Sequence, residues 1–305
     1  MRLLLIVNPA ASSMTPRRRV KIQRELGHHH RLEVAETTSR GHATRLARAA
    51  ARDGVEVVVV AGGDGTLNEA ADGLAGTETA LAPLPAGSTN VFARSIGMSN
   101  RIDPAIEELL ASIEARAFRR VGLGNGNGRH FLFHLGAGFD AEVIEQVERH
   151  HRLKRHLAHP MFAVAAFTTF FRGYDREHAQ YSVEVNDGEA VGDGFFTIVS
   201  NATPYAFFGP RPLRVSRAAG LEHKLALTMF RRLKPGVLIP AVVSSMARGR
   251  YIQRQRDIVQ RGDIDRLTLT ALHGPFPWQV DGDYLGEVER LEITYVPDAL
   301  TLVMP

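Results

Sequence analysis

Residues 62–66, Gly-Gly-Asp-Gly-Thr, stand between an apolar run that ends at Val60 and a helical pattern that begins near Thr66. Glycines allow positive φ angles and let a ligand lie against the backbone, and the free N–H groups of a helix N-terminus bind anions. The junction therefore suits a phosphate chain, with Asp64 placed to hold a metal ion or to orient an attacking hydroxyl. A tight strand–helix turn capped by Asp64 or Thr66 explains the same residues without a ligand.

Two further loops repeat this design. Residues 83–94 (PLPAGSTNVFAR) lead from a strand into a helix that opens at Asn90, where Ser88 or Thr89 would either cap the helix or bind a phosphate. Asn8 ends the first apolar run of the chain. The carboxyl ends of neighbouring parallel strands meet at one edge of an open α/β sheet, where ligands bind. The coincidence of three such loops favours a nucleotide site over three unrelated turns.

A pair of aspartates near the end of the chain is the third feature that could do chemistry. Gly282 separates Asp281 from Asp283 and predicts a tight turn that points both carboxylates into one site. Two close carboxylates favour a proton or a metal ion between them. A solvated Asp-Gly turn between two strands remains the alternative.

The elements that must position these residues change in character along the chain. Up to about residue 120 we predict strands at 3–7, 32–37, 56–60 and 80–84, and helices at 17–26, 42–52, 67–74, 90–96 and 104–115. Strands that alternate with helices of this length predict a parallel sheet covered on both faces. Later strands at 181–185, 195–200, 224–230, 266–271 and 290–295, and a hairpin at 122–130, predict a mainly antiparallel domain with helical insertions at 141–172 and 234–256.

Composition narrows the class of protein. The 305 residues include no cysteine, which excludes disulfides, thiolate zinc sites and cysteine nucleophiles. The apolar run near the N-terminus and the apolar-leaning stretch 161–171 are too short for a signal peptide core and a membrane span. We therefore expect a cytoplasmic protein, with peripheral membrane association. The net charge of +4 fits anionic lipids, nucleotides or nucleic acid without choosing among them. The histidine-rich stretches 28–30 and 149–156 lack carboxylates at metal spacing, so we interpret them as basic surface.

The sequence resembles a known family. GGDGTLNEA (62–70) closely matches the catalytic-domain signature of diacylglycerol kinase-like lipid kinases, which include the soluble bacterial diacylglycerol kinases and the sphingosine and ceramide kinases. GGDGT alone is shared with NAD kinases, whereas the following Asn68-Glu69 favours the lipid kinases. Further family motifs follow in order and rough spacing, namely Asn8-Pro9, Thr37 with GHA (41–43), GSTN (87–90), GFD (138–140) and DGD (281–283). The chain departs from the family pattern at Ser13, where a glycine is usual, and at Asp283, where a glutamate is usual.

The resemblance implies an architecture and an activity. The fold class would be α/β, with an N-terminal three-layer nucleotide-binding domain (1–120, completed by 290–305) and a C-terminal β-sandwich-like lipid-substrate domain (121–289). ATP and Mg²⁺ would serve as cofactors for transfer of the γ-phosphoryl group to a lipid hydroxyl, with diacylglycerol as the first candidate acceptor and a sphingoid or other glycolipid as the second.

The resemblance also implies roles for particular residues. Asp140 would lie near the polar head of the acceptor, and Asp64 and Asp281 would hold the metal ion carried by ATP. Asp283 would be the general base, with Glu287 as the alternative. The nucleotide would contact Asn8, Thr37, Gly62, Gly63, Gly65, Thr66, Glu69 and Ser88.

Two segments that combine basic and apolar residues indicate which molecules the protein could bind. Arg149, Arg152, Lys154 and Arg155 precede the apolar stretch 161–171, and residues 234–254 have the same character. Both segments are either helices packed on the sandwich or an entrance for lipid chains that leans on an anionic membrane. We expect ATP and a lipid at a membrane surface as partners, expect no nucleic acid, and leave a homodimer open. A NAD kinase and a catalytically weak lipid- or nucleotide-binding regulator remain the alternative functions.

Overall fold

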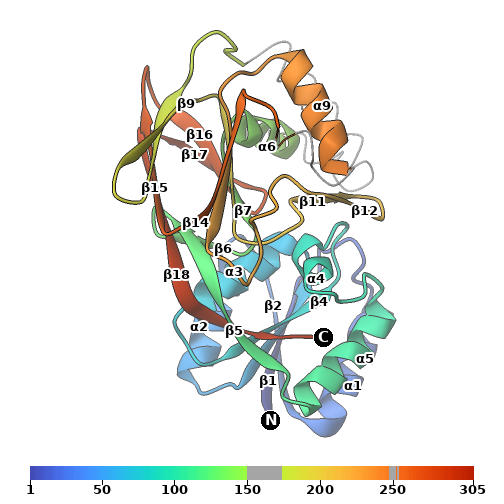
Figure 1. Ribbon diagram of the computed structural model, residues 1–305. Helices are drawn as coiled ribbons and strands as arrows, with labels where there is room; N and C mark the ends of the chain where they lie inside the picture. The colour runs from blue at the N-terminus through green and yellow to red at the C-terminus, as the bar shows by residue number, and fades with distance from the viewer. Residues whose placement is uncertain (150–173, 247–251, 253) are drawn as a thin grey trace. The chain divides into compact units, whose positions relative to one another are not determined.

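The computed structural model describes residues 1–149, 174–246, 252 and 254–305 and divides into two units by internal contacts (Figure 1). Unit 1 comprises Met1–Leu123 with Val296–Pro305, and unit 2 comprises Gly124–Tyr295. Residues 290–295 of the last strand therefore belong to unit 2, and the chain returns to unit 1 at Val296.

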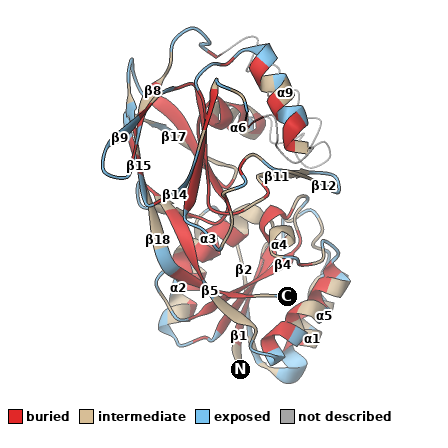
Figure 2. Ribbon diagram, in the orientation of Figure 1, coloured by how far each residue is buried: buried red, intermediate tan, exposed pale blue. Residues whose placement is uncertain are grey.

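Unit 1 is built on a parallel sheet with the strand order β2-β1-β3-β4-β18. Its strands are β1 (Arg2–Val7), β2 (Arg31–Glu36), β3 (Val57–Gly62), β4 (Ala80–Pro85) and the end of β18 (Arg290–Val303). Every residue of β3 and β4 is buried (Figure 2). Strands covered on both faces bury successive side chains on opposite sides, which explains the continuous apolar run at 57–61.

Five helices of the described part of unit 1 flank this sheet. They are α1 (Pro16–His29), α2 (His42–Arg52), α3 (Asp64–Leu74), α4 (Val91–Ser95) and α5 (Ile102–Glu114). Ile22 of α1 and Leu109 of α5 share one core cluster with the strands. Helices α2 and α3 pack on each other at Gly73, where a Cβ atom would lie 2.4 Å from the carbonyl oxygen of Thr44.

Unit 2 contains two antiparallel sheets that enclose a core. One has the order β14-β13-β10-β7-β16-β17, and β8, β9, β15 and the first residues of β18 form the other. Leu135 of the first sheet shares a core cluster with Val183 and Leu267 of the second. The strand bounds are β7 (His134–Gly138), β8 (Tyr181–Val185), β9 (Glu189–Gly194), β10 (Phe196–Ser200), β13 (Leu225–Phe230), β14 (Ile258–Ile264), β15 (Arg266–Ala271), β16 (Phe276–Val280) and β17 (Asp283–Val288).

Two helices, a hairpin whose first strand begins in unit 1, and a second hairpin complete the described part of unit 2. Helices α6 (Phe139–Arg149) and α9 (Pro235–Met246) share a second core cluster with Phe196 and Phe230 of the six-stranded sheet. The predicted hairpin at 122–130 is confirmed as the pair β5 (Phe118–Gly126) and β6 (Arg129–Phe131). A small hairpin joins β11 (Ala206–Phe208) to β12 (Arg211–Leu213).

The predicted fold class is confirmed, since a parallel α/β unit is followed by an antiparallel β-sandwich. The predicted helix at 141–172 begins at Phe139, and Arg152, Lys154, Arg155 and the stretch 161–171 lie outside the described residues. The predicted helix at 234–256 is α9, which is assigned only as far as Met246. Within the described ranges, the helices are too short or too polar to cross a membrane.

Candidate nucleotide and acceptor sites

The loops that follow β1, β3 and β4 are joined to one another by hydrogen bonds in unit 1. The side-chain amide of Asn8 donates to Thr66 Oγ1 (2.9 Å), and the backbone N–H of Ala86 donates to Gly62 O (2.9 Å). The strand order reverses between β1 and β3, and ligands of open α/β sheets bind at such a point. Thr37 follows β2 at the same edge and donates its N–H to Val7 O (2.9 Å).

The backbones of two of these loops are in contact at a pair of glycines. A Cβ atom on Gly87 would lie 2.7 Å from the Cα atom of Gly63, so side chains are excluded from this contact. Residues 63–66 are half-buried and Ser88 is exposed. The start of α3 therefore presents backbone N–H groups at an accessible position, as phosphate binding requires.

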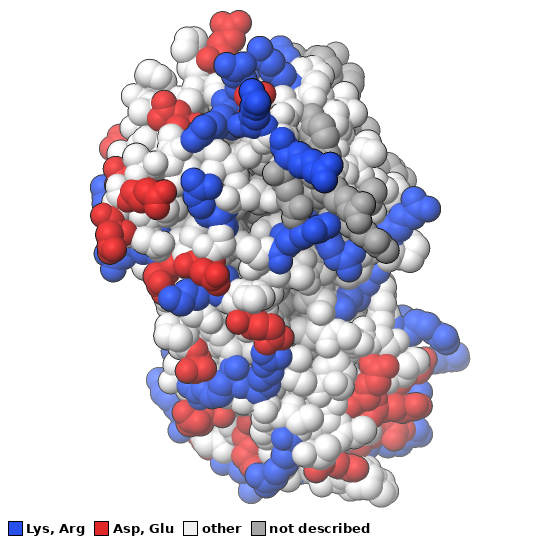
Figure 3. Space-filling view, in the orientation of Figure 1, with Lys and Arg blue, Asp and Glu red and all other residues white. Residues whose placement is uncertain are grey.

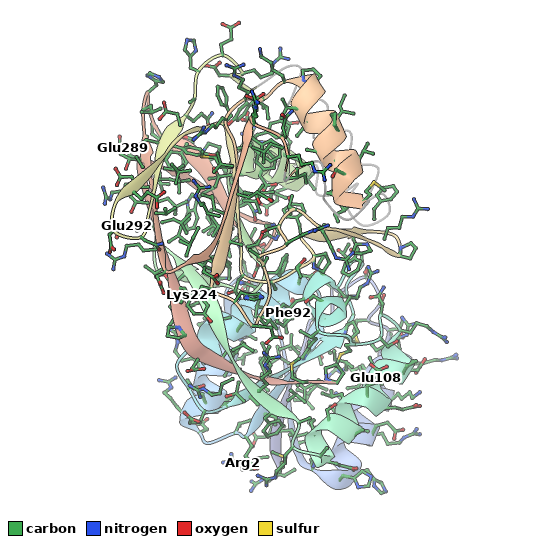
Figure 4. All side chains as sticks on the ribbon, in the orientation of Figure 1. Arg2, Phe92, Glu108, Lys224, Glu289 and Glu292 are labelled. Carbon is green, nitrogen blue, oxygen red and sulfur yellow. The ribbon has the colours of Figure 1, made fainter. Side chains whose placement is uncertain are left out.

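Asp64 caps a helix other than the one it begins. Its Oδ2 atom accepts the N–H of Val91 (2.9 Å) and its Oδ1 atom accepts the N–H of Phe92 (3.0 Å), the α4 residue labelled in Figure 4. The prediction that Asp64 or Thr66 caps α3 is wrong, because α3 begins at Asp64 and its N-cap, Gly63, has no side chain.

The expected capping of α4 by Ser88 or Thr89 is also wrong. The N-cap is Asn90 in a left-handed conformation (φ 49°), and the carboxylate of Asp64 satisfies the first N–H groups. Burial raises the pKa of Asp64, while the hydrogen bonds from Val91 and Phe92 and the charge of Arg94 oppose that rise. The carboxylate is thus held in place within the glycine-rich loops.

Glu69 organises the neighbouring helix. Its carboxylate is buried and accepts the backbone N–H groups of Gly41 (2.7 Å) and Ala43 (3.1 Å). Gly41 is the N-cap of α2 and has a φ of 75°, which glycine adopts without strain. Glu69 therefore supplies the cap that α2 lacks locally and fixes the loop that follows Thr37.

A second cluster of polar groups surrounds Asp140 in unit 2. The hydroxyl of Tyr205 donates to Asp140 Oδ1 (2.5 Å), and Nε2 of Gln279 donates to Asp140 Oδ2 (2.6 Å). Burial raises the pKa of Asp140, and the two hydrogen bonds oppose that rise. Gly136 leaves the space for this carboxylate, because a Cβ atom there would lie 1.9 Å from Asp140 Oδ2.

The same amide reaches the Asp281–Asp283 turn. Oε1 of Gln279, whose side chain is fully buried, accepts the N–H of Gly282 (2.8 Å). The turn is tight as predicted, with φ angles of 48° at Asp281 and 86° at Gly282. Asp140 and the residue before Asp283 are therefore linked through one side chain.

Asp281 faces the backbone of its own unit. Its carboxylate accepts the N–H groups of Leu132 (2.7 Å), Phe133 (3.1 Å) and His134 (2.9 Å), and the residue is 6% exposed. This carboxylate stabilises the connection between β6 and β7. Asp283, in contrast, is half-buried at the start of β17, and Glu287 is exposed in the same strand.

Three functional candidates escaped the sequence analysis. Tyr205 and Gln279 lie far from Asp140 in the sequence, and no motif marks them. Glu142 lies two residues after Asp140, and burial together with the charges of Glu145 and Glu287 raises its pKa to about 7. In the sequence, only the nearby acidic residues of α6 could have suggested a raised pKa for Glu142.

The residues of unit 1 fit a magnesium ion that arrives with a nucleotide. Across the described ranges, no cluster of three or more histidine or acidic side chains could hold a metal ion. Mg²⁺ bound with nucleotide phosphates needs only one or two carboxylates, because waters and phosphate oxygens complete its shell. Each oxygen of Asp64 accepts an N–H group of α4 and retains acceptor capacity, so Asp64 fits this role. Asp281 fits it poorly, because three N–H groups already bind its oxygens.

Comparison with known proteins finds similar sequences for the N-terminal part of the chain. Residues 2–125 match the model of the diacylglycerol kinase catalytic domain. The chain is 38% identical over 124 residues to a "Probable lipid kinase YegS-like" of Chromohalobacter salexigens, covering 39% of this chain and 38% of that relative. It is 35% identical over 170 residues to a protein of the same name from Pseudomonas aeruginosa, covering 55% and 53%. The family match is therefore confined to residues 2–125, which correspond to unit 1 and the start of unit 2.

Likeness to solved structures extends over the whole chain. A diacylglycerol kinase structure from Bacillus anthracis superposes with a TM-score of 0.70 at 20% identity, covering 100% of this chain and 97% of that one. The yeast NADH kinase complexed with NADH gives a TM-score of 0.56 at 11% identity, covering 100% and 84%. These likenesses establish a shared fold. The matched region spans between about a third and a half of the two curated relatives.

Proposed function

We propose that this protein transfers the γ-phosphoryl group of ATP to the hydroxyl of a lipid, with diacylglycerol as the first candidate acceptor and phosphatidic acid as the product. The contact of the Gly63 and Gly87 loops carries this proposal, because it presents N–H groups and Asp64 together within the family-matched residues 2–125. The lipid kinase names of the similar proteins support a lipid acceptor over a soluble one.

In this proposal unit 1 binds the nucleotide. The N–H groups at the start of α3 bind the phosphates. Glu69 contributes indirectly, because its carboxylate holds the Thr37–Gly41 loop. Asp64 holds the magnesium ion, which neutralises phosphate charge during phosphoryl transfer. The other proposed nucleotide contacts are Asn8, Gly62, Gly63, Gly65, Thr66 and Ser88.

Unit 2 supplies the groups that act on the acceptor. Asp140, oriented by Tyr205 and Gln279, accepts a hydrogen bond from the polar head of the lipid. Asp283 is the proposed general base for the acceptor hydroxyl. A positioned general base accelerates a reaction by about 10²–10⁴-fold. Asp281 contributes indirectly, because its hydrogen bonds hold the turn from which Asp283 projects.

The test measures phosphate transfer from labelled ATP by the purified full chain. Mixed micelles of diacylglycerol, micelles of a sphingoid base, NAD⁺ and buffer alone are compared as acceptors. We expect labelled lipid with diacylglycerol, and loss of the label in Asp64→Asn with its folding checked by circular dichroism. Wild-type turnover in Asp64→Asn would contradict the role of Asp64.

The alternatives give different results in the same assay. The fold likeness to the yeast NADH kinase makes a dinucleotide the second candidate acceptor. Label on NAD⁺ and none on any lipid would replace the lipid kinase proposal. ATP binding without transfer to any acceptor would instead indicate a regulator with little catalytic activity.

The general base is tested separately. We expect Asp283→Ala to lower turnover by about 10²-fold or more, and Glu287→Ala, the matched carboxylate in the same strand, to change it by less than about tenfold. The reverse order would assign the base to Glu287.

A further inference from the structure

Helix α9 buries Val237 and Ala241 in the core of unit 2 and also carries aliphatic residues on its exposed side. Ile239, Val242 and Val243 are 62%, 51% and 60% exposed, whereas Ser244 and Ser245 are buried. The three aliphatic residues have the spacing of one helix face, and exposed residues are visible along α9 in Figure 2. Helix α9 contains no charged residue. The outer face of a helix on a soluble domain is normally polar. The solvent-facing side of α9 is therefore built for an apolar environment.

The β11–β12 hairpin is joined to α9 and carries a further exposed apolar residue. Strand β12 packs against α9, and the N–H of Arg214 donates to Ser245 O (2.9 Å). Phe208, at the turn of this hairpin, is 54% exposed. We name Ile239, Val242, Val243 and Phe208 the α9 patch.

The surroundings of the α9 patch are positively charged. Arg231, Arg232 and Lys234 directly precede the helix, and Arg211 lies in β12, and all four residues are exposed. Figure 3 shows basic side chains gathered over the region of α9 and β12. The sequence from 204 to 256 contains a single acidic residue, Glu222. Asp257, which follows this segment, forms an ion pair with Arg232 (3.7 Å).

We propose that the α9 patch is the surface through which this protein docks on an anionic lipid bilayer. Aliphatic and aromatic side chains enter the headgroup region, while a basic rim is attracted to anionic lipids, and the two signals together bind more firmly than either alone. A second copy of this chain is a poorer occupant, because a symmetric contact through this patch would bring the two basic rims together.

The inference deepens the proposed function, since a kinase acting on a membrane lipid must reach that lipid, but its test needs no turnover. The full chain is mixed, without ATP, with vesicles of phosphatidylcholine or of phosphatidylcholine with about one third phosphatidylglycerol, and binding is measured by co-sedimentation. We expect binding to the anionic vesicles that weakens at about 0.5 M salt, and little binding to the neutral ones.

The decisive variant is Ile239→Gln with Val243→Gln. Both positions are exposed, so the fold is expected to survive, and we expect affinity for anionic vesicles to fall by about tenfold or more. The matched control is Val20→Gln on α1, because Val20 is 64% exposed and also has basic neighbours. Lys234→Gln with Arg211→Gln should weaken binding and flatten its salt dependence.

Several outcomes would overturn the inference. These are equal binding to both kinds of vesicle, no binding to either, unchanged binding in the decisive variant, and equal weakening by Val20→Gln. A dimer in solution that the decisive variant dissociates would assign the patch to a second copy. Lipid phosphorylation in detergent micelles without vesicle binding would reject the docking surface alone, and vesicle binding without phosphorylation would reject the proposed function alone.

Discussion

Replacement of Asp281 by alanine should destabilise unit 2 far more than loss of an ordinary carboxylate would. The change leaves three buried N–H groups, those of Leu132, Phe133 and His134, without the acceptor that they share. A hydrogen bond to a charged group contributes about 1.5–3 kcal/mol, and a buried donor without a partner costs about 1–3 kcal/mol. Because the three bonds share one carboxylate and are not additive, we expect a total loss of about 3–5 kcal/mol.

The chain contains its own reporter for this experiment. Trp278 is the only tryptophan, lies in β16 and is 7% exposed, so its fluorescence follows the unfolding of unit 2. For a unit of this size, 1 kcal/mol corresponds to roughly 2–4 °C in melting temperature. We therefore expect the fluorescence transition of Asp281→Ala to fall by roughly 10 °C. Circular dichroism would report the remainder of the chain in the same samples.

Two further variants make the experiment specific. Asp283→Ala, two residues away in the same turn, should lose less than about 1 kcal/mol because the side chain is only half-buried. Asp281→Asn keeps an oxygen for Phe133 and His134 and loses the acceptor for Leu132, so about half of the stability loss should return. A Trp278 transition of Asp281→Ala within about 1 kcal/mol of the wild type would refute the reasoning.

Three other changes test the structure independently. Since the folded-state pKa of Glu142 is about 7 and its ordinary value is 4.5, its contribution to stability is present at low pH and is lost as the pH rises towards 7. Between pH 5 and 8 the wild type should therefore lose about 1 kcal/mol more of its unit 2 stability than Glu142→Gln, after allowance for solvent screening. Tryptophan fluorescence measures this stability, and the same pH dependence in both proteins would contradict the prediction. Gly73→Ala should lower stability by about 2 kcal/mol in thermal melts, because its Cβ would meet the backbone of α2 at 2.4 Å. The control Gly236→Ala has open space around it and should lower stability little. Equal melting temperatures of the two variants would show that α2 and α3 can separate. Gln279→Met keeps the volume of the side chain but removes the link to Asp140, so turnover with lipid should fall about tenfold with an unchanged KM for ATP. Unchanged turnover with a raised KM for ATP would show that Gln279 acts on nucleotide binding instead.

The strands and helices of unit 1 could be predicted because their signals are local. The apolar run before Gly62 and the helical pattern after it are contained in one short segment, and β3 and α3 form there. The three loops at one sheet edge follow from the alternation of strands and helices, and the structure joins them by hydrogen bonds. Their function as a nucleotide site remains a proposal.

The partners of the carboxylates could not be predicted in the same way. Asp64 caps a helix that begins 27 residues later, and Asp281 binds backbone N–H groups up to 149 residues away. Capping residues are normally sought within the first turn of their own helix, so the sequence pointed to Ser88 and Thr89 for α4. The contact of Asp64 depends on how the loops after β3 and β4 pack, and that of Asp281 on how the turn after β16 packs against the β6–β7 connection. No short pattern encodes either arrangement.

The path of the chain has a consequence for biosynthesis. Unit 2 is inserted between Leu123 and Val296, so β4 receives its neighbour β18 only after every residue of unit 2 has been synthesised. Until then, the growing chain carries a parallel sheet with an unpaired edge at β4, and such edges pair readily with other chains. Domains usually complete their folding in order from the N-terminus during synthesis. Here unit 2 can complete its folding first. Unit 1 gains its last strand only when β18 emerges from the ribosome and pairs with β4.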